Sequence, residues 1–133
     1  MKKEYMAFIV EDDKIETSII KKIINSNKSI TNSEFNGNGL IALEKLQQLI
    51  TSSEKLPTFI LLDFNMPVMN GLKFLEKIKN IEGINKIPIF MNSSSVEIDK
   101  HHGFIEYENV KESFSKPFSN QNLVTILNYI ETN

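Results

Sequence analysis

Residues 59–71 read FILLDFNMPVMNG, and this stretch decides the fold class of the chain. Four apolar residues in succession, followed by turn-forming residues, predict a short strand that is buried on both faces. The run ends at Asp63, and a loop containing proline and glycine follows at once. In open parallel α/β sheets, ligands bind at the carboxyl edge of the strands. We therefore expect Asp63 to lie at the functional edge of a parallel sheet.

Strand-like and helix-like segments alternate along the rest of the chain. Apolar runs predict strands at residues 5–10, 33–36, 59–62, 88–91 and 110–115, of which the second is weak, polar and placed at a sheet edge. Helical spacing predicts helices around residues 15–24, 42–50, 72–78, 96–104 and 123–130, with Ser119 or Asn120 as a cap for the last. Five β-then-α units in succession predict a three-layer α/β/α fold with a parallel sheet between the helices.

Length and composition predict one soluble domain over residues 1–133, without a linker, a repeat or an output domain. The chain has 133 residues, of which 41% are hydrophobic and 24% are charged, as in ordinary globular proteins. The net charge is -2 and the lysines are scattered, which argues against a nucleic-acid partner. The absence of cysteine excludes disulfides and thiolate metal sites.

The N-terminus does not read as a targeting segment. The lysines at positions 2 and 3 precede an apolar run that is too short for a signal peptide and is stopped by three acidic residues. No apolar stretch in the sequence approaches the length of a membrane span. We expect a cytoplasmic protein that does not bind a membrane.

Polar residues follow the predicted strands one, three, four and five, whose carboxyl ends meet at one edge of a parallel sheet. In chain order these residues are Glu11, Asp12 and Asp13, then Asp63 and Asn65, then Ser93, Ser94 and Ser95, then Lys116. Two carboxylates about 4 Å apart repel each other by about 4 kcal/mol at an effective dielectric constant of about 20. One lysine cannot neutralise two or three carboxylates, whereas a divalent cation can, and an all-oxygen ligand set suits Mg²⁺. For Asp13 alone we favour a role as N-cap of the first helix.

This ordered set resembles the response-regulator receiver domain, the chemotaxis-regulator-like fold, over essentially the whole chain. The matching motifs are Glu11-Asp12, Asp63-x-Asn65-Met66-Pro67-x-x-x-Gly71, Pro88-x-x-x-x-Ser93 and Lys116-Pro117-Phe118. The resemblance implies a flavodoxin-like strand order, 2-1-3-4-5. The lack of an output domain is similar to the single-domain regulators of the family.

The resemblance also implies a role for each matching residue. Asp63 matches the phosphoacceptor, a carboxylate nucleophile that attacks a phosphohistidine. Ser93 matches the switch hydroxyl that hydrogen-bonds the phosphoryl group. Lys116 matches the lysine that pairs first with Asp63 and then with a phosphoryl oxygen. In the family the bond before Pro117 is usually cis, a form that is rare outside proline.

For the cofactor and the partners, the resemblance implies a magnesium-dependent phosphorelay. Glu11 and Asp12 match the acidic pair that holds Mg²⁺ together with Asp63, with Asp12 as the direct ligand of the pair. Asn65 matches the residue whose backbone carbonyl completes the protein ligands. The implied phosphodonor is a histidine kinase or a histidine phosphotransfer protein, and the output is a contact with a downstream protein that the sequence does not name.

The chain departs from the family pattern in the fifth strand. The family usually has an aromatic residue three positions before the lysine, where this chain has Ser113. The period-two geometry of a strand turns the neighbouring Phe114 to the opposite face, so we expect Phe114 in the core. The readout then differs from the family's serine-aromatic coupling, or the strand is shifted by one residue.

Three further features have simple structural explanations. His101-His102 fits a solvated helix end better than a metal site. The segment 37–39, Gly-Asn-Gly, fits a helix entry, because it lacks the full glycine spacing of a phosphate-binding loop. Met66 and Met69 flank the site either as a lid or as packing residues.

Two other functions remain open at this point. An aspartate-nucleophile phosphatase of the haloacid dehalogenase type needs a second acid two residues after the nucleophile, where this chain has Asn65. A degenerate receiver would act only as a binding module. We expect no enzyme activity beyond self-catalysed phosphotransfer and slow autodephosphorylation.

Overall fold

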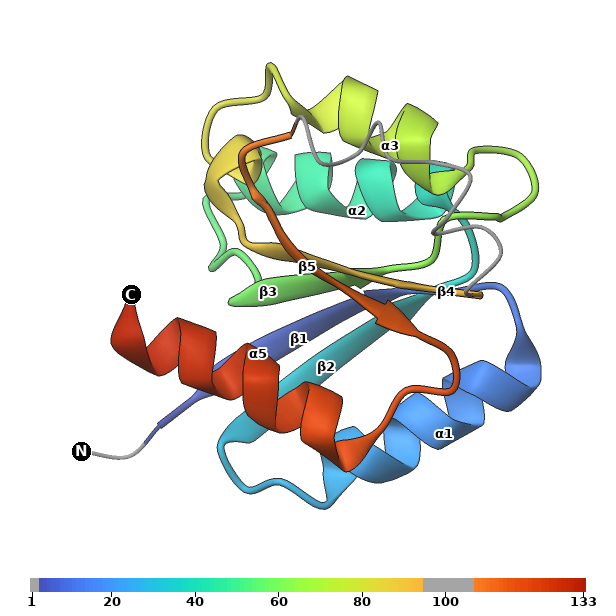
Figure 1. Ribbon diagram of the computed structural model, residues 1–133. Helices are drawn as coiled ribbons and strands as arrows, with labels where there is room; N and C mark the ends of the chain where they lie inside the picture. The colour runs from blue at the N-terminus through green and yellow to red at the C-terminus, as the bar shows by residue number, and fades with distance from the viewer. Residues whose placement is uncertain (1–2, 95–106) are drawn as a thin grey trace.

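Five parallel strands form one sheet in the order β2-β1-β3-β4-β5 (Figure 1), as predicted. The computed structural model describes residues 3–94 and 107–133. Its strands are β1 (Tyr5–Val10), β2 (Ile30–Asn36), β3 (Phe59–Leu62), β4 (Ile89–Ser93) and β5 (Val110–Ser115). Its helices are α1 (Lys14–Asn25), α2 (Gly39–Thr51), α3 (Gly71–Ile78) and α5 (Asn120–Thr132), with a 3-10 turn η1 (Ile84–Lys86).

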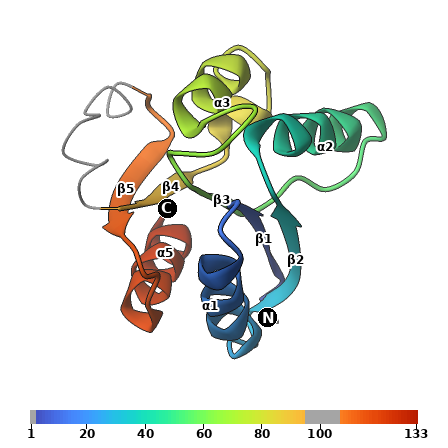
Figure 2. The ribbon, with the colours of Figure 1, turned by 90° about the vertical axis from the view of Figure 1, so that its right-hand side faces the viewer.

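The helices cover the sheet on both faces, so the predicted three-layer architecture is confirmed (Figure 2). Helices α1 and α5 lie on one face, and α2 and α3 lie on the other. Alternate residues of the central strands feed two separate cores, because successive side chains of a strand point to opposite faces. Phe8 and Ile60 pack toward α2 and α3, whereas Ile9 and Leu61 pack toward α1 and α5.

Helix starts follow the capping chemistry of the sequence. Asp13 caps α1, because its Oδ1 accepts a hydrogen bond of 3.0 Å from the Ile15 amide, which confirms the capping role that we favoured. Ser119, and not Asn120, caps α5 in a reciprocal capping box with Asn122.

Some predicted boundaries and burial assignments were wrong. Strand β2 begins at Ile30 rather than at residue 33, because this edge strand pairs with β1 from Ile30 to Asn36, with one register shift at Thr31, despite its polar residues. Strand β4 runs on to Ser93, which places that residue at the strand end and not in the following loop. Ile15, which belongs to the predicted apolar stripe, is 73% exposed because the buried face of α1 runs through Glu16, Ile20 and Ile24, and Ile15 lies off this face.

Two predictions fall outside the described residues, namely the helix over 96–104 and the histidine pair at 101 and 102. Within the described part of the chain, no helix combines the length and the apolar character that a membrane crossing requires.

Candidate functional site

The site is assembled by backbone pairing just beyond the ends of the strands. The Asp63 amide donates to the Val10 carbonyl at 2.9 Å, and the Lys116 amide donates to the Ser93 carbonyl at 2.9 Å. These bonds continue the sheet's ladder by one residue and fix where Asp63 and Lys116 leave it. The predicted convergence of distant segments at the carboxyl edge is therefore confirmed for the loops that follow β1, β3 and β5.

Lys116 is placed between two buried carboxylates. Its Nζ lies 3.0 Å from Oε2 of Glu11 and 3.3 Å from Oδ2 of Asp63. The side chains of both acids are only 2% exposed, whereas the lysine side chain is 22% exposed. A single ammonium group thus balances one of the two negative charges that the acids can carry.

The carboxylates of Glu11, Asp12 and Asp63 form a cluster that can hold a cation. One carboxylate oxygen from each lies within 4.8 Å of the others. Oε1 of Glu11 and Oδ1 of Asp63 are buried, and the described residues offer neither of them a hydrogen-bond donor. Burying an oxygen without a partner costs free energy, and a cation bound to these two atoms would offset that cost. Their hard oxygen character suits Mg²⁺, so the residues present fit that ion.

The protonation of the two buried acids reflects the same excess of negative charge. Burial raises the pKa of Glu11 to about 8, and the charge of Asp63 adds to this effect, while Lys116 opposes it. Burial also raises the pKa of Asp63, to about 6, against the opposing effect of Lys116. For Lys116 itself, burial acts to lower the pKa, but the two carboxylates outweigh it and the pKa is raised. Without a cation, the cluster therefore retains a proton near neutral pH.

Ser93 faces the loop that carries Asp63. Its Oγ accepts a hydrogen bond of 3.0 Å from the Phe64 amide, and the residue is buried. Asn65 lies on the exposed side of the same loop, and its backbone acts to lower the pKa of Asp63, against the larger effect of burial. Ser94 is half-buried, and Ser95 lies outside the described residues.

Comparison with known proteins identifies this arrangement. The family model of the response regulator receiver domain matches residues 7–128. The chain belongs to the response regulator receiver family. Receiver domains are signalling domains of two-component systems; they interact with histidine kinases or phosphotransfer proteins and generally bind Mg²⁺ at an acidic pocket.

Curated relatives of this receiver domain include a sensor histidine kinase and a two-component response regulator. The domain is 29% identical over 125 residues to the sensor histidine kinase CheAY of Helicobacter pylori. The aligned region covers 93% of this chain and 15% of that protein. The domain is 31% identical over 102 residues to the two-component response regulator ARR17 of Arabidopsis thaliana. The aligned region covers 71% of this chain and 64% of that protein. The chain spans between 15% and 22% of the length of the first four curated relatives that it matches.

Solved structures show the same fold. A two-component response regulator from Cytophaga hutchinsonii superposes with a TM-score of 0.86 at 22% identity, and all of both chains is covered. The chemotaxis response regulator CheY4 of Vibrio cholerae superposes with a TM-score of 0.76 at 20% identity, with 96% of this chain and 98% of that chain covered. At this level of identity, the likeness supports the fold alone.

The loop that carries Asp63 is packed tightly against its neighbours in this receiver domain. Met66 is buried in the core beneath α2 and α3, and Met69 packs against that core, so both methionines are packing residues. A Cβ atom on Gly71 would lie 2.6 Å from the Asp63 carbonyl oxygen, so only glycine allows this close return of the chain. The Lys116-Pro117 peptide is cis, as the family resemblance implied.

The fifth strand confirms that Phe114 is a core residue. Its ring lies parallel to that of Phe90, with the centroids 6.1 Å apart, on the face that α1 and α5 cover. Ser113 pairs with Met91, and the register of β4 and β5 is irregular between Ile89 and Phe90. The receiver domain therefore has serine where the family pattern has its aromatic residue.

One buried acid near the site, Glu16, was not expected from the sequence. The side chain of this α1 residue is held between β4 and the loop after β5, where its Oε2 accepts hydrogen bonds from Nδ2 of Asn92 and from the Phe118 amide, both at 2.8 Å. A signal was present in the sequence, because residue 16 lies four positions before Ile20 and shares its helix face. The charge of Glu16 concealed its place on the buried side of α1.

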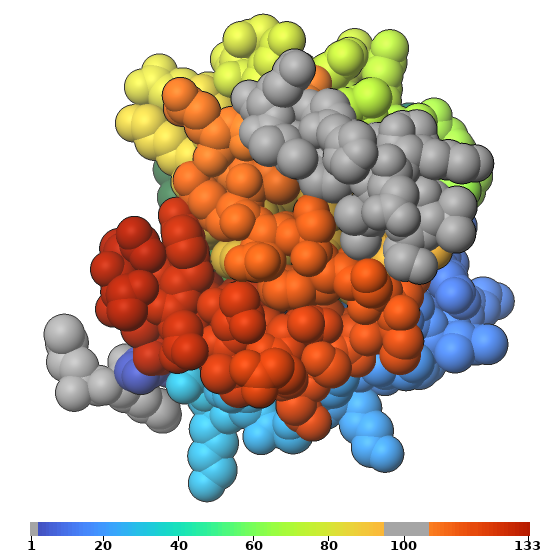
Figure 3. Space-filling model, viewed as in Figure 1, coloured from blue at the N-terminus to red at the C-terminus, as the bar shows by residue number. Residues whose placement is uncertain are grey.

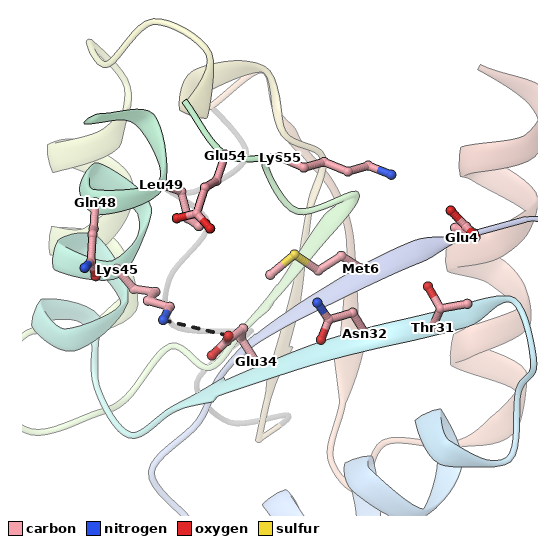
Figure 4. Close-up of a pocket in the computed structure, with 10 residues that line it drawn as sticks. All are labelled: Glu4, Met6, Thr31, Asn32, Glu34, Lys45, Gln48, Leu49, Glu54 and Lys55. Atoms are coloured by element: carbon pink, nitrogen blue, oxygen red, sulfur yellow. Dashed lines mark ion pairs between the residues drawn. The ribbon is translucent and has the colours of Figure 1, made fainter. Parts of the chain in front are cut away.

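Of two surface hollows, one is lined by carboxylates of the acidic cluster and the other is not. One, of about 380 Å³, adjoins the acidic cluster and includes Glu11, Asp12 and Lys14 in its wall. Another, of about 350 Å³, lies between β2 and α2 and is crossed by an ion pair of 3.8 Å between Lys45 and Glu34 (Figure 4). The residues labelled in Figure 4 include none of the carboxylates of the acidic cluster.

Proposed function

We propose that this receiver domain accepts a phosphoryl group on Asp63 from a histidine kinase or a histidine phosphotransfer protein, in a reaction that needs Mg²⁺. The observation that carries the proposal is the placement of Asp63, a buried carboxylate that combines an unpartnered Oδ1 with an ion pair to Lys116 through Oδ2. Such a group is poised both to bind a cation and to react.

The transfer itself is a substitution at phosphorus. A carboxylate oxygen of Asp63 forms the new O–P bond while the P–N bond of the phosphohistidine breaks, and the electron pair of that bond stays on the imidazole nitrogen. Phosphoryl transfer depends on alignment and charge neutralisation more than on covalent help from the protein. Bound Mg²⁺ would supply the positive charge that neutralises the phosphoryl oxygens, held by the carboxylates of Glu11, Asp12 and Asp63 and by the backbone carbonyl of Asn65.

Lys116 and Ser93 are the groups of this chain that would contact the phosphoryl oxygens. The Lys116 ammonium, now paired with Glu11 and Asp63, would exchange its contact with Asp63 for a phosphoryl oxygen. Oγ of Ser93 accepts a hydrogen bond from the Phe64 amide, which leaves the hydroxyl proton available to donate. Together these contacts would place positive charge and a donor around the transferred group.

Signalling would follow from the change in charge at the site. Phosphorylation adds about two negative charges, which draw Ser93 and Lys116 toward the phosphoryl group. Both residues adjoin β5, and the surfaces of β5 and α5 lie next to each other on one face of the molecule (Figure 3, orange and red). A downstream protein that binds this face differently in the two states would read the signal. Ser113 means that this readout does not use an aromatic residue at that position.

The proposal is tested by incubating the protein with Mg²⁺ and a small phosphoramidate and then measuring the intact mass. One phosphoryl group should be added, and both Asp63→Asn and removal of Mg²⁺ should abolish the addition. Incorporation that survives Asp63→Asn would show that another residue is the acceptor. No incorporation with any donor would favour a pure binding module, and turnover of generic phosphomonoesters would favour a phosphatase.

A further inference from the structure

We propose that Glu16 is a positioning residue for phosphoryl transfer, which holds the segments that carry Ser93 and Lys116 in one fixed arrangement. The inference rests on the proposed function and adds to it a residue outside the acidic cluster. Glu16 acts through its two hydrogen-bond donors and does not touch the reacting atoms.

The contacts of Glu16 join three elements at one atom. The residue belongs to α1 and is only 4% exposed. Its Oε2 accepts from Nδ2 of Asn92, in β4, and from the backbone amide of Phe118, in the loop after β5. Hydrogen bonds to a carboxylate are shorter and stronger than those between neutral groups, and both distances of 2.8 Å fit this description.

Each donor lies close in sequence to a group that would contact the phosphoryl oxygens. Asn92 immediately precedes Ser93, and Phe118 is two residues after Lys116. The β4–β5 ladder joins the two segments up to the pair Ser93–Ser115, and the Lys116 amide extends it by donating to the Ser93 carbonyl. Glu16 adds a link beyond the end of this ladder, through α1 to Phe118, and thereby restricts how the loop after β5 shifts relative to β4.

Packing alone does not explain a glutamate at this position. An aliphatic residue could fill the space beside Ile20 without the free-energy cost of burying a charge. None of the ion pairs found among the described residues includes Glu16. Asn92 also supports a role beyond packing. Its Nδ2 donates to Glu16, although its Oδ1 is buried without a donor among the described residues. The hydrogen-bonded pair of Glu16 and Asn92 is therefore explained by the link that it makes between α1 and β4.

Loss of this link should affect the reaction more than the binding of Mg²⁺. With leucine at position 16, the Phe118 amide and the Asn92 side chain lose their shared acceptor, and the loop that carries Lys116 loses its hydrogen-bonded link to α1. A displacement of about 1 Å in a reacting group can slow a reaction by about a hundredfold. Glu11, Asp12 and Asp63 do not contact Glu16 in any hydrogen bond of the described residues, so the ligand set stays in place.

The test compares three variants of the full chain at a temperature well below their unfolding transitions. Glu16→Leu keeps the volume and removes the acceptor, whereas Glu16→Gln keeps an oxygen acceptor without the charge. Ile20→Ala, one turn further along α1, loosens the packing of the same helix without removing a hydrogen bond. The measurements are the phosphorylation rate against phosphoramidate concentration, Mg²⁺ binding by calorimetry, and the amide proton shift of Phe118.

We expect Glu16→Leu to lower the maximal rate by about tenfold or more, with half-saturation and Mg²⁺ affinity changed by less than about threefold. Glu16→Gln should keep the rate within about threefold of the wild type and retain a downfield Phe118 amide proton. Ile20→Ala should lower the melting temperature but leave the rate unchanged. If Glu16→Leu does not fold, Asn92→Leu takes its place, and the same loss of maximal rate is expected.

A wild-type rate in the leucine variant, or equal losses in the Glu16→Leu and Ile20→Ala proteins, would overturn the positioning role. A wild-type protein that takes up no phosphoryl group would overturn the proposed function itself, and the role of Glu16 with it. The two failures are distinguished by the wild-type sample alone.

Discussion

The ammonium group of Lys116 lies 3.0 Å from Oε2 of Glu11, although 105 positions separate the two residues in the sequence. This contact ties the end of β5 to the end of β1, two strands that are not neighbours in the sheet. It also leaves the negative charge of Asp63 only partly compensated, because the same ammonium serves both acids. The chemistry of the site follows from this shortage of positive charge.

The first prediction concerns the pH dependence of stability without Mg²⁺. The pKa of Glu11 is about 8 in the folded protein and close to 4.5 in the unfolded chain. Between these values the folded state binds more protons than the unfolded state, so the free energy of unfolding falls as the pH rises. Glu11→Gln removes this effect and should stabilise the metal-free protein at pH 8 by about 1–2 kcal/mol.

Thermal unfolding in a chelator at pH 5 and at pH 8 checks this prediction. The melting temperature of the glutamine variant relative to that of the wild type should rise between pH 5 and pH 8. A difference that shrinks as the pH rises would show that Glu11 is stabilised as an anion, contrary to the raised pKa.

The second prediction separates the neighbours Asp12 and Asp13. We expect Mg²⁺ to stabilise the wild type by about 2.7 kcal/mol when its concentration is a hundred times the dissociation constant. Asp12→Asn should lose most of this gain, because it removes a ligand of the cation. Asp13→Asn is the matched control and should keep it, because Asp13 caps α1 and asparagine caps equally well. Melting curves with and without Mg²⁺ decide the matter, and equal losses in the two variants would argue against Asp12 as a ligand.

The third prediction is that Lys116 opposes the binding of Mg²⁺ while it supports phosphorylation. Lys116→Met removes a positive charge next to the cation site. This should make the free energy of Mg²⁺ binding more favourable by about 1 kcal/mol, which corresponds to an affinity about fivefold higher. The same variant should be phosphorylated more slowly, since the phosphoryl oxygens lose an ammonium partner. Calorimetry and a time course of intact mass measure the two effects. Weaker Mg²⁺ binding in the variant would mean that Lys116 organises the ligands and does not compete with the ion.

The fourth prediction concerns strain in the loop after β3. Val68 has a φ angle of 68° and is exposed, and such a backbone conformation is unfavourable for a β-branched residue. Val68→Asn should raise the free energy of unfolding by about 1 kcal/mol, because asparagine tolerates positive φ. Urea denaturation measures the change. A loss of stability in the variant would show that the valine side chain contributes contacts that outweigh the strain.

The sequence predicted the parts of this molecule that depend on local pattern. The continuous apolar run of β3 and the alternation of strand and helix were sufficient for the fold class, and turn residues after each strand identified the edge at which Asp63 and Lys116 meet. The start of β2 was missed because an edge strand is held by hydrogen bonds to its neighbour, which its polar residues from Thr31 onward do not reveal. Glu16 was missed because its burial depends on two donors, in β4 and in the loop after β5, that only the folded chain brings together.

The most direct measurement is to identify the residue that carries the phosphoryl group. Reduction of the phosphorylated protein with borohydride converts an aspartyl phosphate to homoserine, which peptide mass spectrometry can locate. We expect homoserine at position 63 alone, and only after incubation with both the donor and Mg²⁺. Homoserine at position 12 or 13, or a stable phosphoryl group on another side chain with position 63 unchanged, would contradict it.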